Sequence, residues 1–326
     1  PGENAVLTAD PWSFLHSVIL KKIKASRGEN KKRFSRANYY ARLAEDFYKA
    51  ANDVELPTKG TLLYYGMLNL VKCYLSTKGI LLETTHEHHG LNLPLGSKYK
   101  VQVLPISRSG INIYAEFCKA LGSPVKGKSV IELSDVFSNI PELHGLCADL
   151  NFVRRKKYLP IKINFLLNKS FDWLFTEIIF DKKHEQPLLT SRFLKDERKK
   201  YFKEASLREG KIVYRSKRRK RVNNNNWPAI YANILKEYSR FNIASILTRS
   251  GYKYYCDLSP EIYHHLCNSL LAMFFIGTAA RYRPSEVEEA MNGEWRPLVT
   301  ETAAVTPKQF LYQLVSLTAN KLCILP

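Results

Sequence analysis

Apolar residues recur at helical spacing most densely between residues 58 and 78. Pro57 precedes this segment and Gly79 follows it, and these residues are start and stop signals of a helix. The main apolar stripe consists of Leu63, Met67, Leu70 and Tyr74. Because further leucines flank this stripe, the segment predicts a helix that is buried on most sides, at the centre of a domain.

A second segment of this kind spans residues 260–282, and Pro284 ends its pattern. Its apolar centre contains Leu266, Leu270, Leu271, Met273, Phe274 and Ile276. We expect this helix and the helix at 58–78 to pack together in the interior. Further helices are expected at 11–23, 35–52, 227–241, 285–291 and 306–322.

The middle of the chain is rich in short runs that favour strands. Strands are expected at 99–106, 110–114, 130–133, 158–167, 171–180 and 246–258, and the first two form one hairpin candidate. The whole pattern predicts an α+β fold, a predominantly helical bundle with a small, mostly antiparallel sheet inserted. We expect a single domain over 1–326, made of N-terminal helices (1–80), a mixed α/β region (81–191), a basic arm or insertion (192–226) and C-terminal helices (227–326).

Charge adds a strong signal, because 50 Lys and Arg against 30 Asp and Glu give a net charge of +20. Residues 192–221 alone contain 14 basic and 4 acidic residues. They have few apolar residues, so we expect an exposed arm that cannot bury itself. The basic run at its end consists of Arg215, Lys217, Arg218, Arg219, Lys220 and Arg221. This run is either a phosphate-binding segment for RNA or DNA, with Trp227 and nearby tyrosines stacking on bases, or a solvated loop without a partner.

Other features narrow the class of protein. Six cysteines are scattered singly, which favours free thiols in a reducing compartment over disulfides or a zinc site. The longest apolar run, 266–280, is too short to cross a bilayer, so we expect a cytoplasmic protein without membrane contact. Walker, GxGxxG, HExxH and GxSxG motifs are absent, and no cofactor is expected.

Three histidines stand together at 86, 88 and 89, but no cysteine or carboxylate spacing supports a metal site around them. His89 precedes Gly90 in a loop, where it is either a general base for a ribose hydroxyl or a cap for backbone groups. Arg281 and Arg283 stand at the end of the second buried helix. They either complement the helix dipole or bind phosphate through their guanidinium groups.

Several further residues are candidates for a pocket near these groups. Lys72 lies among apolar neighbours and is either directed outward or paired in a polar pocket beside the His-Gly loop. Tyr64 and Tyr65 carry hydroxyls that suit the same pocket, although core aromatic residues are commoner. His264 and His265 fall one turn inside the second helix, and we expect one to face the core and one a groove.

Three segments in order resemble the YaaC family: LLYYGMLNLVK at 62–72, HGL at 89–91 and ARYRPS at 280–285. The resemblance runs from about Trp12 to the C-terminus, and the segment 192–221 is more basic than that family leads one to expect. The Tyr-Tyr-Gly helix followed by a His-Gly loop is also similar to HEPN domains, which are helical bundles of RNA-cleaving toxins and defence proteins. Active HEPN ribonucleases carry an Arg, then four to six residues, then a His on a late helix, and no histidine here has an Arg at that spacing.

Two hypotheses follow. The resemblance implies a nucleic-acid-engaging protein in antiviral defence that, if catalytic, is a metal-independent ribonuclease with His89, Arg281 and Arg283 as working residues. The alternative is a non-catalytic regulatory subunit with a pocket for a nucleotide or a protein partner. The missing Arg-His spacing favours the second hypothesis, and the charge favours nucleic acid in both.

Overall fold

The computed structural model describes residues 5–106, 110–153, 157–168, 170, 172–190, 201–208, 210–223, 226, 229, 230, 233, 234, 243–258 and 263–326, without the side chains of 189, 190 and 205–208. The chain forms two compact units. Unit 1 consists of Pro1–Arg154 and Ile262–Pro326, and unit 2 is Arg155–Glu261. These boundaries differ from the segment limits at 80, 191 and 226 that the sequence suggested.

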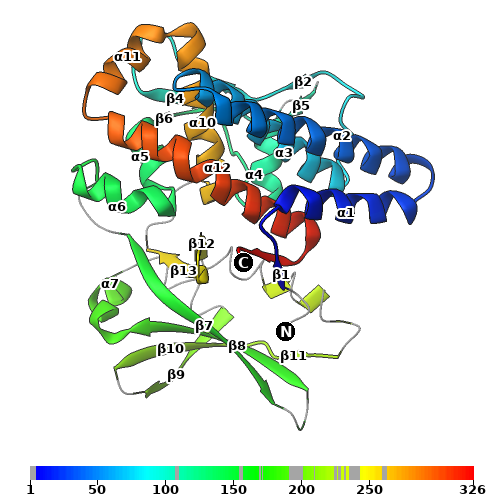
Figure 1. Ribbon diagram of the computed structural model, residues 1–326. Coiled ribbons are helices and arrows are strands. Elements are labelled where there is room, and N and C mark those ends of the chain that lie inside the picture. Colours follow the sequence, from blue (N-terminus) through cyan, green and yellow to red (C-terminus); the bar gives the residue numbers. More distant parts are fainter. Residues whose placement is uncertain are drawn as a thin grey trace. The chain divides into compact units, whose positions relative to one another are not determined.

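Unit 1 is built around two helices that are buried along most of their length. They are α3 (Thr58–Thr77) and α10 (His265–Tyr282), and every residue of α10 from Leu266 to Ala279 is buried. The prediction that these two helices pack together is confirmed by their contacts. The long helices α2 (Gly28–Ala50) and α12 (Arg296–Ala319) pack against α3, and α1 (Pro11–Lys24) packs against α2 and α12 (Figure 1).

Local signals explain where some of these helices begin. The Asp10 carboxylate accepts hydrogen bonds from the backbone N–H groups of Trp12 (3.0 Å) and Ser13 (3.3 Å), so it caps α1. The prediction that the last helix begins at residue 306 is wrong, because α12 begins at Arg296 and contains Pro307 in its interior. Pro297 occupies the first turn of α12, where a missing N–H costs nothing.

The remaining elements of unit 1 are short. Three helices, α4 (Ile113–Ala120), α5 (Leu133–Ser138) and α6 (Pro141–Asp149), lie between the long helices in sequence, and α11 (Pro284–Asn292) follows α10. Strand β1 (Ala5–Leu7) pairs with β14 (Leu322–Ile324), and β2 (Glu87–His88) pairs with β5 (Ile111–Asn112). Strand β4 (Lys100–Val103) lies between β3 (Leu91–Asn92) and β6 (Ser129–Glu132). The expected hairpin of 99–106 with 110–114 is therefore wrong, because β4 and β5 take other partners.

Unit 2 contains an antiparallel sheet that has seven strands among the described residues. Its order is β12 (Ile243–Thr248), β13 (Gly251–Asp257), β7 (Tyr158–Asn168), β8 (Trp173–Asp181), β10 (Lys211–Ser216) and β9 (Phe202–Arg208), and β11 (Lys220–Arg221) also pairs with β8. The mixed α and β content agrees with the prediction. The sheet, however, is much larger than the small inserted sheet that the sequence suggested.

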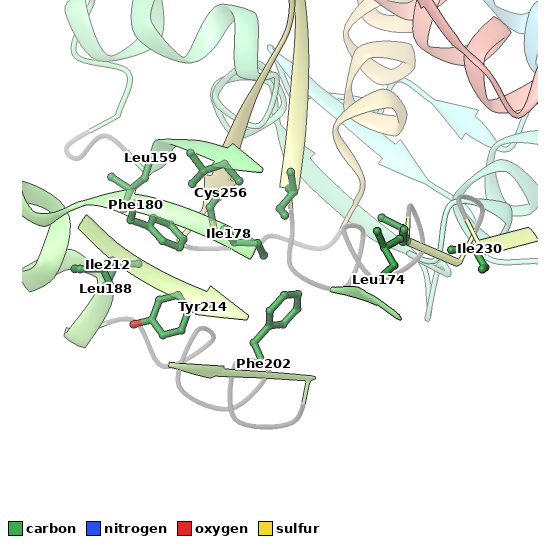
Figure 2. Packing of buried hydrophobic residues seen from close by; sticks show 13 residues of the cluster. Leu159, Leu174, Ile178, Phe180, Leu188, Phe202, Ile212, Tyr214, Ile230 and Cys256 are labelled. Carbon is green, nitrogen blue, oxygen red and sulfur yellow. The ribbon is translucent and has the colours of Figure 1, made fainter. Parts of the chain in front are cut away.

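One face of this sheet carries an apolar core. Phe180 on β8 and Tyr214 on β10 meet edge to face, with ring centroids 5.9 Å apart, and Ile178 lies beside them (Figure 2). Leu188 from α7 (Glu185–Thr190) and Phe202 from β9 belong to the same cluster. Every second side chain of each strand points to this face, and these side chains pack together to form the core.

The expectation that the basic segment cannot bury itself is wrong for its described part. Phe202, Ile212 and Tyr214 are buried in the core of unit 2. Ile212 and Tyr214 point to one face of β10, while Lys211 and Arg215 alternate with them. The charged residues therefore occupy the face opposite to the core. Residues 192–200 and most of the helix expected at 227–241 lie outside the described residues.

Candidate functional site

The His-Gly loop is fixed by a buried asparagine. Gly90 has φ +79°, and a Cβ at this position would lie 1.9 Å from Oδ1 of Asn112. The Asn112 amide is fully buried, and its nitrogen donates to the carbonyls of Leu104 and Pro105, both at 2.9 Å. Its Oδ1 accepts from the N–H of Ala115 and so caps α4. Only glycine fits at position 90 without displacing this network.

The backbone of the loop is fixed as well. The carbonyl of His86 accepts from the N–H of Ile111 at 2.8 Å, and the carbonyl of His89 accepts from the N–H of Tyr114 at 3.2 Å. The Gly90 carbonyl accepts from Leu104 N–H at 2.9 Å. The loop therefore holds His89 at a defined position.

The His89 side chain is exposed, and the loop occupies one of its two ring nitrogens. Its Nδ1 accepts from the N–H of Leu91 at 3.2 Å, and its ring packs against Phe274 with a centroid distance of 5.5 Å. Partial burial, together with the charges of His88 and Arg281, lowers the pKa of His89. A neutral imidazole whose Nδ1 accepts must carry its proton on Nε2. Among the residues that the structure describes, none accepts from this N–H.

Arg281 lies at the end of α10 and is exposed. Its Nη1 donates to the Tyr65 hydroxyl at 2.9 Å. Its guanidinium carbon lies 5.3 Å from the ring centroid of Tyr65 and 5.1 Å from that of Tyr282. The other N–H groups of this guanidinium have no acceptor within the described part of the chain. Arg281 is thus positioned by one hydrogen bond and two aromatic rings, while most of its donors are available.

Two buried hydroxyls lie close to this arginine. Tyr64 is 2% exposed, and its ring centroid lies 5.4 Å from those of Tyr65 and Phe274. Its burial raises the pKa of the Tyr64 phenol, with Arg281 opposing the shift, so the hydroxyl stays protonated within electrostatic reach of the guanidinium. Thr278 is one turn before Arg281 on the same side of α10. Neither the Tyr64 hydroxyl nor the Thr278 hydroxyl has a partner among the described residues.

We call Tyr64, Tyr65, His89, Thr278 and Arg281 the Arg281 cluster. Its accessible donors are guanidinium N–H groups and one imidazole N–H, the Tyr64 and Thr278 hydroxyls are buried, and the cluster contains no carboxylate. Buried polar groups without partners are rare in folded proteins, and an enclosed water or ion is one explanation for them. The arrangement suits an anion with several acceptor oxygens.

Arg283, in contrast, is occupied by contacts within unit 1. Its guanidinium donates to the carbonyls of Ser97 (2.9 Å) and Pro94 (2.6 Å) and to the Glu286 carboxylate (3.3 Å). These bonds fix the loop that precedes β4. Arg283 therefore acts in the structure as a support for this loop rather than as an available cation.

The other predicted pocket residues divide between two places. Lys72 pairs with Glu87 of the His-Gly loop at 3.0 Å, and its ammonium group lies over the Tyr40 ring. His264 and His265 lie at the start of α10, about 25 Å along the helix from Arg281. His264 caps the helix through Leu266 N–H, so the expected position inside the helix is wrong for this residue. The structure therefore brings Tyr64, Tyr65, His89 and Arg281 together and leaves the two histidines apart.

The basic run lies in unit 2. Arg215 donates through Nε (3.0 Å) and Nη2 (2.7 Å) to the buried carboxylate of Glu177. The Arg219 guanidinium stacks over the Trp173 ring at 4.4 Å. Lys217, Arg218, Arg219 and Arg221 are exposed, and Lys220 is half-buried in β11. We call residues 217–221 the basic turn.

Sequence reasoning missed two residues that shape the Arg281 cluster. Asn112 precedes a helix and carries an N-cap signal, but nothing in the sequence links it to Gly90. Phe274 lies in the predicted apolar centre, and its contact with His89 depends on tertiary packing.

The described residues show neither a group of three potential metal ligands nor a helix with the length and apolar content of a membrane span. The six cysteines are free and buried. No curated protein and no solved structure matches the chain. The family model described as YaaC-like Protein matches residues 7–318, which is nearly the whole chain. The chain therefore belongs to the YaaC-like family.

Proposed function

We propose that this YaaC-like protein binds nucleic acid and that the Arg281 cluster contacts a backbone phosphate. The observation that carries the proposal is the exposed guanidinium of Arg281, which donates to the Tyr65 hydroxyl at 2.9 Å and whose other N–H groups have no acceptor among the described residues. A guanidinium with free N–H groups matches the oxygens of a phosphate, and pre-positioning reduces the entropy lost on binding.

The charge of the protein supports a polyanion as the ligand. The net charge of +20 attracts polyanions over long distances and raises their rate of association. The basic turn offers further cations in unit 2, and Arg219 is held there by Trp173. Several separate phosphate contacts make binding strongly salt-dependent and largely independent of sequence.

The geometry of His89 favours binding over catalysis. A general base for a ribose hydroxyl needs an unprotonated ring nitrogen directed at the substrate. In His89 the unprotonated Nδ1 already accepts from Leu91, so the other ring nitrogen is a donor. His89 thus serves, beside Arg281, as a second hydrogen-bond donor to the anion. A HEPN-type ribonuclease and a role in antiviral defence remain predictions from the resemblance.

The experiment measures binding of a fluorescent single-stranded RNA and DNA by anisotropy at several salt concentrations. Arg281→Ala should weaken binding about 10-fold to 100-fold, since a hydrogen bond to a charged group contributes about 1.5–3 kcal/mol. Arg27→Ala is the control, because it removes the same charge from an exposed residue at the start of α2. Arg27 is about 30 Å along that helix from Phe47, which stacks on Tyr65.

The proposal fails if the intact protein does not bind either nucleic acid at low salt, or if Arg281→Ala and Arg27→Ala bind as wild type does. Incubation with RNA, without added metal, tests the role of His89. Intact RNA after prolonged incubation agrees with a binding role. Cleavage that His89→Gln abolishes would show instead that the histidine changes tautomer and acts as a base.

A further inference from the structure

The most exposed aromatic side chain among the described residues is next to the Arg281 cluster. Tyr282 is the last residue of α10, and 71% of its surface is accessible. A tyrosine combines a large apolar ring with a polar hydroxyl, and tyrosines are enriched at binding interfaces. No hydrogen bond of its hydroxyl is found in the part of the chain that the structure describes.

The Tyr282 ring is nevertheless tied to the proposed phosphate contact. The Arg281 guanidinium carbon lies over the Tyr282 ring at 5.1 Å from the centroid and over the Tyr65 ring at 5.3 Å. Arg281 is therefore flanked by two aromatic rings, a buried-side ring and an exposed one. Because Tyr282 is mostly accessible, much of its ring surface remains open for a flat ligand.

The backbone around Tyr282 is held rigidly. The N–H of Arg283 donates to the Ala279 carbonyl at 2.8 Å, which closes the last turn of α10. The Arg283 side chain then anchors this end to the carbonyls of Pro94 and Ser97. Because the backbone is already fixed here, only the side chain of Tyr282 has to be ordered when a ligand binds.

Of the four acidic residues at 286–294, two are paired with basic side chains, whereas Glu288 and Glu294 form no ion pair with the described residues. Glu286 pairs with Arg283 at 3.3 Å, and Glu289 pairs with Lys98 at 2.6 Å. These two carboxylates are thus compensated by basic partners. The exposed cation closest in sequence to Tyr282, Arg281, retains available donors.

We propose that Tyr282 stacks on an unpaired base of a single-stranded nucleic acid while Arg281 binds the adjacent phosphate. This inference rests on the proposed function and names its substrate class. Each nucleotide of a single strand carries a base and a neighbouring phosphate. The Tyr282 ring and the Arg281 guanidinium are in contact, so they can bind the base and the phosphate of the same nucleotide. Bases of a duplex are stacked on each other and offer no open face to an exposed tyrosine. Stacking on an aromatic ring tolerates every base, so the site selects single strands without reading sequence.

The test compares three ligands of equal length: a single-stranded oligonucleotide, the corresponding duplex and an abasic single strand that keeps the phosphates. Tyr282→Ala should weaken binding of the single strand about 5-fold to 100-fold, the range found for the loss of one stacked base. It should leave binding of the abasic strand unchanged. Tyr282→Trp should restore the single-strand affinity.

Tyr39→Ala is the matched control, because Tyr39 is also an exposed tyrosine (59%) and lies on α2. Thermal unfolding of each variant verifies that the surface substitutions leave the fold intact. Equal binding of the single strand by Tyr282→Ala and Tyr39→Ala overturns the inference. So does an equal loss for the single and the abasic strand.

The two proposals fail in different ways. If Arg281→Ala weakens all three ligands while Tyr282→Ala weakens none, phosphate binding stands and base stacking is excluded. If Arg281→Ala and Tyr282→Ala both leave all ligands unaffected, the proposed function itself is overturned.

Discussion

The contact between α3 and α10 depends on two glycines, and its disruption gives a clear stability prediction. A Cβ on Gly277 would lie 2.8 Å from the Gly60 carbonyl oxygen, 3.0 Å from the Thr61 Cα and 3.1 Å from the Tyr64 Cβ. Ordinary contacts of a Cβ begin at 3.4 Å. Gly277→Ala therefore requires α3 and α10 to separate by about 0.6 Å in a close-packed interior.

The neighbours of this Cβ cannot rotate away, because two are backbone atoms and the third is fixed to a helix. Overpacking of a core by a methyl group typically costs about 1–3 kcal/mol. The higher helix propensity of alanine relative to glycine offsets up to about 1 kcal/mol of this loss. We expect a net loss of about 1–2 kcal/mol and a decrease of about 3–8 °C in the melting temperature of unit 1.

Gly145→Ala provides the matched control. Gly145 lies inside α6, and a Cβ there meets no atom within 4 Å. The same substitution should thus stabilise unit 1 by about 0.5–1 kcal/mol. The measurement is urea and thermal unfolding followed by circular dichroism. The reasoning is refuted if Gly277→Ala is as stable as wild type while Gly145→Ala shows its expected gain.

Three further predictions concern the loop, unit 2 and pH. Gly90→Ala should lower the free energy of unfolding by about 2–4 kcal/mol, because its Cβ displaces Asn112. Gly96 also has a positive φ but lies in open space, so Gly96→Ala should lower it by only about 1 kcal/mol through backbone strain. Equal losses in thermal unfolding would contradict this. Arg215→Ala should destabilise unit 2 by about 3–5 kcal/mol, because it leaves the fully buried Glu177 carboxylate without this partner. Lys211 forms an exposed pair with Asp181, so Lys211→Ala should cost less than about 1 kcal/mol in urea unfolding. Similar losses for the two variants would show that Arg215 is not structural. Burial lowers the pKa of His265 to about 4, so the unfolded chain takes up a proton that folded His265 does not, and this residue should lower the free energy of unfolding by up to about 3 kcal/mol from pH 6.5 to pH 4. His265→Gln should remove this share of the slope and leave the share of the neighbouring His264, whose pKa is also lowered by burial, and an unchanged slope would refute the assignment.

The helices at the centre of unit 1 were predictable because their apolar residues recur with the 3.6-residue period of an α-helix. The segments 58–78 and 260–282 are apolar on most sides, and only each other and neighbouring helices can cover such surfaces. The start of α12 was misplaced because Pro307 resembles a start signal, while the true first-turn proline is Pro297. A proline marks a helix start only when the residues before it are not helical, and tertiary packing decides this.

The sheet of unit 2 was underestimated for a related reason. In β10, the buried residues Ile212 and Tyr214 alternate with Lys211 and Arg215, but Val213 between them is buried as well, so the period of two is incomplete, and net charge dominates the composition of the segment. Charge counts a segment as a whole, whereas burial acts on one face of a strand. The buried pair of Arg215 with Glu177 shows further that a basic run predicted as a ligand surface can supply structural partners.

The convergence of Tyr65 and Arg281 was predicted in outline, and its cause is geometric. Helices α3 and α10 run antiparallel, since Gly60 contacts Gly277 while Tyr64 contacts Phe274. Side chains of a helix tilt toward its N-terminus. Tyr65, one turn after Thr61, therefore leans back toward the crossing at Gly277.

Arg281, one turn after Gly277, leans back toward the same crossing from the other helix. The two side chains consequently meet, and the 2.9 Å bond between them is a result of the register of the crossing. Larger residues at positions 60 and 277 would hold the helices apart and remove this meeting point. The two glycines therefore determine how closely α3 and α10 approach each other. This short distance allows Arg281 to reach Tyr65 and places its guanidinium near the buried hydroxyl of Tyr64.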